Sequence, residues 1–547
     1  MVGLANRACD RCRKRKIKCD FADPCFCCRT SSQACSYDVP IRKRGPKGPR
    51  DQRRQRNRTP VTPTDATLPG VPPQYSDGLL LLEKLRTELN DAIAQEQPSV
   101  PISTIAQLCI SIRCHRSFPI VHERSLRADA TYFFGAEGEC FPTSIGQHGT
   151  KHGLALMRSF TVLTVLCAAQ SFLFAKTTIQ YGEAVGPKFL AAARAMFHYN
   201  EDVDRQTPDA TSLQVRMLLS TCIQQHTGES GLAYHLVNEA SLIARRLRLY
   251  RESVVSQYPP LEATLLRNAF WSLYSADSSA ICCQNRAVIL YEPLFDAEMD
   301  LQGPALNQVP LLDCEREGCM GTLEFGLLQS FHYLRRTWGN ASRLLLSIRQ
   351  LGRMKRERSD FDPAQLMRNR EMYIDFSESL DDIPAILQPS KPLSQDASLS
   401  TAERSSFISL RYRLLSTYYF SKLMIIHECR VLGFALVVGL RDDDDVLASE
   451  EVNVARDYIY TLQSVEFHVL QELGEPGIEL MRSVGSVLLA VSQGSDGRNK
   501  QRAVSQLNVL LDILARLDSQ ASEKLTAQLS VDAAIEFNTS PHDVASE

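Results

Sequence analysis

Apolar residues recur at helical spacing through most of this chain, from about residue 100 to about residue 530. In the stretch 231–250, apolar side chains fall every three or four residues on one face: Leu232, Leu236, Ala240, Ile243 and Leu247. Strict alternation of apolar and polar residues, which is typical of strands, is scarce. Proline and glycine interrupt the pattern near 259–260, 303–310 and 384–392. The pattern predicts a large all-α domain over 100–520.

A shorter helical pattern precedes this body at 79–96. Leu82, Leu85, Leu89 and Ala92 follow the a and d positions of a coiled coil, but for less than two heptads. Two interpretations stay open: a short dimerisation helix, or a helix whose apolar face packs on the body of its own chain.

The longest apolar stretch runs from Phe160 to Ala175 and contains Gln170 and Ser171. It is shorter than the roughly 20 residues that a membrane-spanning helix needs. We therefore expect a buried helix here and no membrane association.

Residues 39–78 differ in composition from the body. They begin with IRKRGPKGPRDQRRQRNR and continue with a Pro/Thr-rich stretch. Such a segment cannot bury enough apolar area to fold alone, which predicts a disordered basic, Pro-rich linker. Five of its basic residues form a nuclear localisation signal, an arm that contacts phosphates, or a solvated charge run. They are Arg42, Lys43, Arg44, Lys47 and Arg50.

Charge is distributed unevenly along the 547 residues. Residues 1–58 hold 17 Lys and Arg and 5 Asp and Glu, a net charge of +12, whereas the remainder carries −14. A basic head on an acidic body indicates that only the head approaches a polyanion. At the other end, 525–547 is an acidic tail with interleaved apolar residues, which is either a frayed terminus or a segment that folds onto coactivators.

Six cysteines within residues 1–38 carry the strongest chemical signal. The spacing Cys-x2-Cys-x6-Cys occurs twice, at Cys9, Cys12, Cys19, Cys25, Cys28 and Cys35. No apolar stretch near the N-terminus could act as a secretory signal, so we expect a reducing compartment, which favours metal over disulfides. Thiolates two residues apart suit zinc. Six thiolates can give each of two zinc ions four ligands only if two sulfurs bridge, and the repeat favours such a shared cluster.

A basic run fills the gap between Cys12 and Cys19, and its length fits a helical turn and a half. A zinc scaffold could hold this short cationic helix without a hydrophobic core. Such a helix suits the DNA major groove, where Lys and Arg donate to O6 and N7 of guanine, while flanking charges contact phosphates. The basic residues are Arg13, Lys14, Arg15, Lys16 and Lys18.

The segment ACDRCRKRKIKCDFADPCFCCRTSSQACSY resembles the fungal binuclear zinc cluster, the Zn2Cys6 DNA-binding domain, in its six cysteines, its basic run and Pro24. The resemblance implies two Zn²⁺ per chain, one held by Cys9, Cys12, Cys19 and Cys25 and the other by Cys25, Cys28, Cys35 and Cys9. It implies that Lys16 contacts bases of a CGG-type half-site, that Arg15 assists, and that Arg13, Lys14 and Lys18 contact phosphates. Cys27 falls outside the repeat and is not expected to bind metal.

Residues 210–290 resemble the fungal-specific transcription factor domain, also called the middle homology region. The likeness lies in ARRLRLYRE and RNAFWSLYSADSS, where Trp271, Tyr274 and Asp277 match the family's tryptophan, tyrosine and aspartate. Ser278 replaces a common arginine, and QNRAV at 284–288 replaces a Gly-Arg-Pro turn. The resemblance implies an all-α regulatory domain behind the head.

The residues themselves favour structural positions for these side chains. Trp271, Tyr274 and Phe270 share one helix and are expected in the core. Asp277 lies one turn from Tyr274 and is expected to bond locally within the bundle. His427 on an apolar helix is expected to be a hydrogen-bonded core histidine and no sensor.

The chain is therefore expected to be a DNA-binding transcription factor of RNA polymerase II genes, acting in the nucleus on a metabolic pathway or biosynthetic gene cluster. By resemblance, activation is favoured over repression. Its expected partners are duplex DNA, coactivators of the transcription machinery and a second copy of the chain. No P-loop, dinucleotide fingerprint or Gly-x-Ser-x-Gly elbow is found, so no enzyme is expected. The alternative is a zinc-stapled protein or RNA interaction module, or a scaffold on a helical body.

Overall fold

The computed structural model describes residues 8–15, 19, 24–31, 34–36, 73–135, 152–228, 230–304, 309–313, 321–357, 363–389, 399–494 and 497–517. The chain divides into two compact units, Met1–Leu68 and Pro69–Glu547. Within the described ranges every regular element is a helix, which confirms the prediction of a mainly α protein. The linker up to residue 72, which contains the five basic residues named above, and the tail 525–547 lie outside the described residues.

The first unit contains two short helices. Helix α1 spans Asp10–Arg15 and α2 spans Phe26–Thr30. Each begins directly after a cysteine, Cys9 or Cys25, and each contains the cysteine three residues further on. The repeat in the sequence is therefore also a repeat of local structure.

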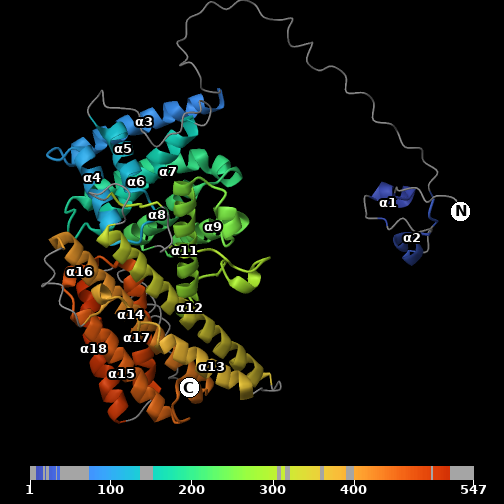
Figure 1. The fold of residues 1–547 in the computed structure, drawn as a ribbon, viewed down its shortest axis with the longest axis vertical. Helices are drawn as coiled ribbons and strands as arrows, with labels where there is room; N and C mark the ends of the chain where they lie inside the picture. The colour runs from blue at the N-terminus through green and yellow to red at the C-terminus, as the bar shows by residue number, and fades with distance from the viewer. Residues whose placement is uncertain are drawn as a thin grey trace, which may run out of the picture. The chain divides into compact units, whose positions relative to one another are not determined.

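The second unit is a helical body whose helices fall into two groups along the chain (Figure 1). The first group runs from α3 to α11 and the second from α12 to α18. The helices of the first group are α3 (Pro73–Glu96), α4 (Ile102–Arg116), α5 (Glu123–Phe134), α6 (His152–Leu173), α7 (Gly182–Gln206), α8 (Ala210–Thr227), α9 (Ser230–Arg246), α10 (Glu252–Val255) and α11 (Pro260–Cys283). Those of the second are α12 (Thr322–Arg356), α13 (Pro363–Ser377), α14 (Thr401–Leu432), α15 (Asp444–Gln463), α16 (Phe467–Gln471), α17 (Gly474–Gly494) and α18 (Arg498–Leu517).

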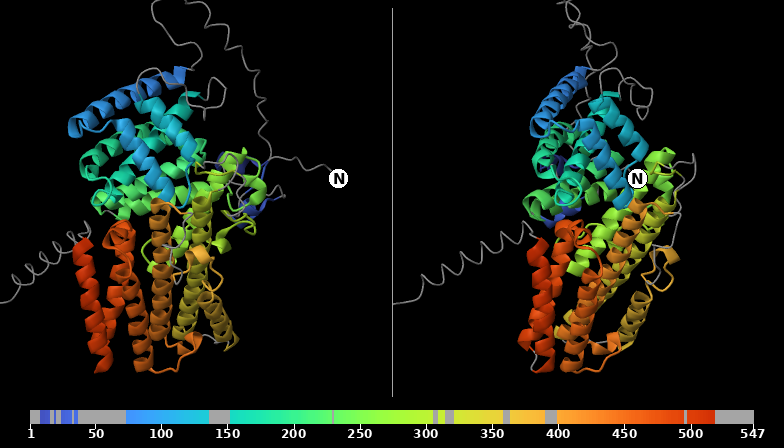
Figure 2. Two further views of the ribbon diagram at one scale, coloured as in Figure 1. Left: turned by 60° about the vertical axis from the view of Figure 1, so that its left-hand side comes forward. Right: turned by 90° about the vertical axis from the view of Figure 1, so that its left-hand side faces the viewer.

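Two hydrophobic cores correspond to these groups. The first core contains buried residues from Leu82 to Leu414, and the second contains buried residues from Cys282 to Leu517. Figure 2 shows the long helices of the second group side by side below the first group. Helices α12 and α14 contribute to both cores: Phe331 and Phe407 lie in the first, and Trp338 and Phe420 lie in the second.

Close approach of α12 and α14 depends on small residues. A Cβ atom at Gly326 would overlap the ring of Phe407, and one at Gly352 would overlap the side chain of Leu432. Helices can approach this closely only where one of them lacks a side chain, because the core is already densely filled. The two glycines therefore fix how the two longest helices of the body meet.

Helix α3 packs on the body. It begins at Pro73, six residues before the predicted start, and proline is favoured at the first position of a helix. Leu82, Leu89 and Ile93 are only 3%, 3% and 1% exposed and belong to the first core. The structure thus shows the second of the two alternatives given for this segment, and its predicted part in dimerisation stays a prediction.

Helix α6 contains the apolar stretch noted in the sequence. Gly153–Leu173 is long and apolar enough to cross a membrane by length and composition. However, 78% of this stretch is buried inside the protein, so it forms the centre of the first core as a buried helix.

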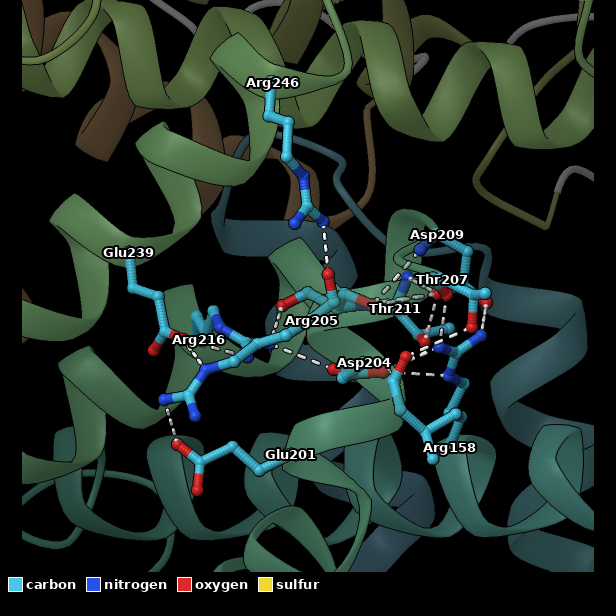
Figure 3. A network of polar contacts seen from close by, with 12 residues as sticks. Arg158, Glu201, Asp204, Arg205, Thr207, Asp209, Thr211, Arg216, Glu239 and Arg246 are labelled. Atoms are coloured by element: carbon cyan, nitrogen blue, oxygen red, sulfur yellow. Dashed lines mark hydrogen bonds and ion pairs between the residues drawn. The ribbon is translucent and has the colours of Figure 1, made fainter. Parts of the chain in front are cut away.

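A polar network joins α6, α7, α8 and α9 (Figure 3). Arg158 donates to Asp204 at 3.0 Å and to Asp209 at 2.6 Å, while Arg216 donates to Asp204 at 3.0 Å and to Glu239 at 3.3 Å. The Arg216 side chain is fully buried, and its charge is offset by these two carboxylates. The network therefore fixes the relative positions of four helices.

The aromatic residues singled out in the sequence lie where expected, apart from Tyr274, which is half-buried. Phe270 and Trp271 are 0% and 3% exposed and belong to the first core. The Trp271 Nε1–H donates to the Gln302 carbonyl at 2.7 Å, and the Arg335 guanidinium lies 4.1 Å from the Trp271 ring centre. These contacts are structural.

Asp277 shapes the turn after α11. Its carboxylate is fully buried and accepts hydrogen bonds from Arg286 at 2.6 Å and from the backbone N–H groups of Ile289 and Leu290 at 2.9 and 2.6 Å. Its partners lie just beyond the end of α11, in and after the QNRAV segment, so Asp277 bonds locally within the bundle as expected. Gln284 at this helix end has a φ of +54°.

His427 on α14 is hydrogen-bonded but not fully buried. Its Nδ1 lies 2.9 Å from an oxygen of Glu451, which also accepts from Arg430 at 2.7 Å. The side chain of His427 is 31% exposed. His427 therefore has the hydrogen-bond partner that was expected, but it is only partly buried and not a full core residue.

Candidate metal centre

The six repeated cysteines of the first unit come together around its two short helices. Cys9, Cys12, Cys19, Cys25 and Cys28 are at most 5% exposed, and Cys35 is partly buried. These cysteines form the core of this unit, since its buried hydrophobic cluster consists of five of them. A small unit whose buried core, within the described residues, consists of cysteines is typical of domains that a metal holds together.

The sulfur atoms form two overlapping groups of four. One group is Cys9, Cys12, Cys19 and Cys25, the other is Cys9, Cys25, Cys28 and Cys35, and within each group all Sγ atoms lie within 4.8 Å of one another. Cys9 and Cys25 belong to both groups. These are the two ligand sets that the family resemblance implied.

The distances between the sulfurs fit a tetrahedral metal ion. Cys9 Sγ lies 3.8 Å from Cys25 Sγ and 3.7 Å from Cys28 Sγ, and Cys12 Sγ lies 3.7 Å from Cys25 Sγ. A tetrahedral site with Zn–S bonds of about 2.3 Å sets its sulfurs about 3.8 Å apart. A disulfide would need about 2.05 Å, and the described cysteines are all free. The donor set therefore fits zinc.

Backbone hydrogen bonds hold the sulfurs in place. The Cys12 N–H donates to Cys9 Sγ, and the Cys25 N–H donates to Cys35 Sγ, both at 3.5 Å. The Asp10 N–H donates to the Ser36 carbonyl at 2.8 Å and joins the two ends of the unit. Such bonds orient ligand atoms in metal sites.

The crowded thiols differ in acidity. Burial, followed by the proximity of Cys9, raises the pKa of Cys12 to about 12. Burial acts in the same direction on Cys9, but hydrogen bonds, first that from the Cys12 backbone, lower the pKa of Cys9 to about 6. Metal binding at such a site must displace protons, which makes its affinity depend on pH.

The basic residues assigned to DNA lie on or beyond α1. Lys14 and Arg15, at the end of the helix, are exposed. Arg13 is in the same helix, but its side chain is outside the described residues, as are Lys16 and Lys18 entirely. Helix α1 as described ends at Arg15, so it covers only the first part of the predicted cationic helix.

Two contacts in this unit were missed by the sequence reasoning. Arg11 Nη1 donates to Ser31 Oγ at 2.5 Å and so links α1 to the end of α2. Ser31 Oγ also donates to the Cys27 carbonyl at 2.6 Å. Neither residue stands at a ligand position of the cysteine repeat, so the spacing carried no signal for them. Cys27 is partly buried and belongs to neither group of four sulfurs, as expected.

Two family models match the chain. The fungal Zn(2)-Cys(6) binuclear cluster domain matches residues 7–44, and the fungal specific transcription factor domain matches residues 111–314. Both domains of the fungal Zn2Cys6 transcription factors are present in this chain. The Zn2Cys6 match contains all six repeated cysteines, and the second match contains the segment 210–290 that showed the resemblance in the sequence.

Curated relatives of the chain are fungal transcription regulators that match it over short stretches. A maltose fermentation regulatory protein of Saccharomyces cerevisiae is 46% identical over 46 residues, which are 8% of this chain and 10% of that protein. The glucose transport transcription regulator of the same yeast is 51% identical over 45 residues, 8% and 4% of the two chains. A transcriptional regulatory protein of Schizosaccharomyces pombe is 56% identical over 41 residues, 7% of each. The chain thus covers a tenth or less of the length of these relatives.

Proposed function

We propose that this chain is a nuclear, sequence-specific DNA-binding regulator of RNA polymerase II genes, whose Zn2Cys6 domain holds two Zn²⁺ and recognises CGG-type half-sites. The observation that carries the proposal is the pair of overlapping sulfur groups that share Cys9 and Cys25. With two shared sulfurs, six cysteines complete two tetrahedral sites. A closed site of this kind is structural, because it leaves no open position for a substrate.

The charge of the head supports DNA as its partner. The Zn2Cys6 domain presents Lys14 and Arg15 at the exposed end of α1 and continues into Lys16 and Lys18. We assign base contacts to Lys16, with help from Arg15, and phosphate contacts to Arg13, Lys14 and Lys18. Lys and Arg recognise guanine through O6 and N7, whereas phosphate contacts fix orientation without reading sequence.

The other parts of the chain complete the proposal. The basic linker residues Arg42, Lys43, Arg44, Lys47 and Arg50 act as nuclear localisation signal or phosphate-contacting arm. The helical body over 100–520 is regulatory, the acidic tail 525–547 recruits coactivators, and activation of a metabolic or biosynthetic gene set is the expected outcome. A homodimer would place two heads on paired half-sites. No catalytic activity is proposed.

The decisive experiment is selection of binding sites from random duplex DNA by the full chain, together with elemental analysis of zinc. The expected result is an enriched motif that contains CGG and a zinc content near two per chain. Lys16→Ala should abolish the preference for the half-site and leave the zinc content unchanged. Arg29→Ala, which removes an exposed cation on α2, is the matched control and should keep the preference.

Two outcomes would contradict the proposal. If selection enriches no CGG-containing motif, the head is better explained as a protein or RNA interaction module. If Lys16→Ala loses its zinc, the effect of this residue on DNA binding is indirect and the assignment of its base contact is wrong.

A further inference from the structure

The last two helices of the body carry long stretches without charge. Helices α17 and α18 pack against each other and are separated only by residues 495–497, so they form an antiparallel hairpin. No charged residue occurs between Ser483 and Gly494 or between Ala503 and Leu511. Because 23% of the residues of the chain are charged, a neutral surface of this extent calls for an explanation.

The outward side of this hairpin exposes aliphatic side chains. Leu489 on α17 is 47% exposed, and Val504 and Leu511 on α18 are 40% and 51% exposed. The opposite side is already used by the fold, since Val487 and Leu510 belong to the second core. Figure 2 shows α18, drawn in red, at the outer edge of the second group of helices. The exposed side, called the hairpin face below, is therefore accessible to another molecule.

The exposed residues of α18 follow a pattern that complements itself. An antiparallel copy of α18, centred between Leu507 and Asn508, sets each Val504 against Leu511 of the other copy. The same register brings Lys500 within one helical turn of Asp512 of the other copy. Both charged residues are exposed, and neither forms an ion pair within the described part of its own chain. A two-fold interface requires this kind of self-complementarity.

The size of the hairpin face is sufficient for a specific interface. Helices of 21 and 20 residues are about 30 Å long and about 10 Å wide each, so the face measures about 600 Å². Two copies would bury about 1,200 Å² in total, which is the lower end of the range for specific protein–protein interfaces. Depletion of charge at the centre of the face is also typical of interface cores.

Helix α3 does not offer an equivalent surface. Its a and d residues Leu82 and Leu89 are buried in the first core of their own chain. A coiled coil through that side of α3 would expose this core to solvent, whereas pairing through the hairpin face would leave both cores intact.

We propose that the hairpin face binds a second copy of this chain, so that two hairpins form an antiparallel four-helix interface about a two-fold axis. Leu489, Val504 and Leu511 of both copies make its apolar centre. Lys500 and Asp512 pair between the copies at both ends and fix the register. The inference rests on the proposed function and deepens it, because it names the surface that brings two DNA-binding heads together.

Analytical ultracentrifugation of the full zinc-loaded chain, without DNA, measures the association. The mass of the native chain should rise from 61.3 kDa towards twice that value as the concentration increases. Leu511→Arg places a cation from each copy in the apolar centre and should weaken the dimer by at least about tenfold. Leu242→Arg is the matched control, because Leu242 on α9 is 53% exposed but lies outside the hairpin face, and it should leave the association unchanged.

Charge reversal tests the antiparallel register. Lys500→Glu sets two carboxylates against each other at both ends of the interface, and Asp512→Lys does the same with two cations, so each should weaken the dimer. The double variant exchanges the two signs and should restore the affinity of the native chain. All these positions are exposed, so thermal midpoints should stay within about 2 °C of the native value, which shows that weaker association is not loss of the fold.

Several results would overturn the proposal. They are a native chain that stays at 61.3 kDa up to its highest soluble concentration, a Leu511→Arg variant that associates like the native chain, and a double charge variant that does not regain affinity. A chain that dimerises only after residues 525–547 are removed would show that its own tail covers the hairpin face, which overturns the proposal as well. A monomeric chain that still enriches a CGG-containing motif would refute the pairing and leave the proposed DNA recognition intact.

Discussion

At the scale of single residues, the charged side chains that are buried or partly buried in the helical body are of two kinds. Some are fully compensated, such as Asp277, which accepts three hydrogen bonds within the turn that follows α11. Others are held at a cost, such as Glu262 on α11, whose pKa is raised by burial. Groups of the second kind couple the stability of the fold to pH, because folding changes their affinity for protons.

Glu262 belongs to the second kind and predicts a pH dependence. Burial, followed by repulsion from Asp209, raises the pKa of Glu262 to about 7, although its oxygen accepts from the Ala210 N–H at 2.7 Å. A carboxyl whose folded pKa is raised contributes stability that is fully present below its unfolded pKa of about 4.5 and is lost as the pH rises through 7. The loss amounts to about 3 kcal/mol.

The variant Glu262→Gln keeps an oxygen for the Ala210 N–H but does not titrate. Its free energy of unfolding, measured by urea denaturation at pH 4.5, 6 and 7.5, should rise relative to the native chain as the pH increases, by about 3 kcal/mol in total. The exposed Glu88→Gln should show no such trend. A constant difference between Glu262→Gln and the native chain would mean that Glu262 is ionised in the fold throughout this range.

The sequence predicted the roles of residues that are recognised by their local spacing. It could not predict contacts between residues that only the folded structure brings together. The six cysteines were found because metal ligands recur at fixed intervals. A local hydrogen bond was expected for Asp277, but its partners could not be named because they lie beyond its helix.

At the scale of elements, the contact between α12 and α14 allows a matched comparison within one helix. Gly326 faces Phe407 with no room for a Cβ, whereas a Cβ at Gly339 would meet nothing within 4 Å. Gly326→Ala should therefore destabilise the body by about 1–3 kcal/mol. Gly339→Ala should stabilise it by up to about 1 kcal/mol through helix propensity.

Thermal midpoints of the two variants measure these opposite effects. Because both substitutions add one methyl group to the same helix, the difference between them reports the contact with Phe407. Equal midpoints would show that α14 can move away from α12 without cost, and the close approach would then have no energetic importance.

Helix periodicity predicted most elements of the body but could not predict how they pair. The a and d pattern at 79–96 was compatible with a coiled coil and with packing on the body, because both bury the same apolar face. The structure buries Leu82, Leu89 and Ile93 against the first core. Pairing of this kind depends on residues far away in the sequence.

At the scale of the whole molecule, the two units rely on different sources of stability. The first has a core of cysteines, and the second has two large apolar cores. Removal of zinc with a strong chelator should therefore unfold the Zn2Cys6 domain and abolish DNA binding, while the thermal transition of the body stays within about 2 °C, because its cores contain none of the proposed ligands.

Hydrogen exchange with and without the chelator provides the measurement. Protection should be lost around Cys9–Cys12 and Cys25–Cys28 and should be retained in α6 and α14. A chelated chain that keeps its protection in the first unit would contradict a metal-held head. Restoration of both protection and DNA binding by added zinc is the control for irreversible damage.

The sharing of α12 and α14 between the two cores bears on how this kind of protein can be rearranged by evolution. The family match ends at residue 314, yet Phe331 and Phe407, which complete the first core, follow later in the chain. A gene fusion that replaced the chain after residue 314 would remove these residues and expose apolar side chains of the first core to solvent. Viable crossovers are therefore expected before α3, where a new head can be joined, and not between the two halves of the body.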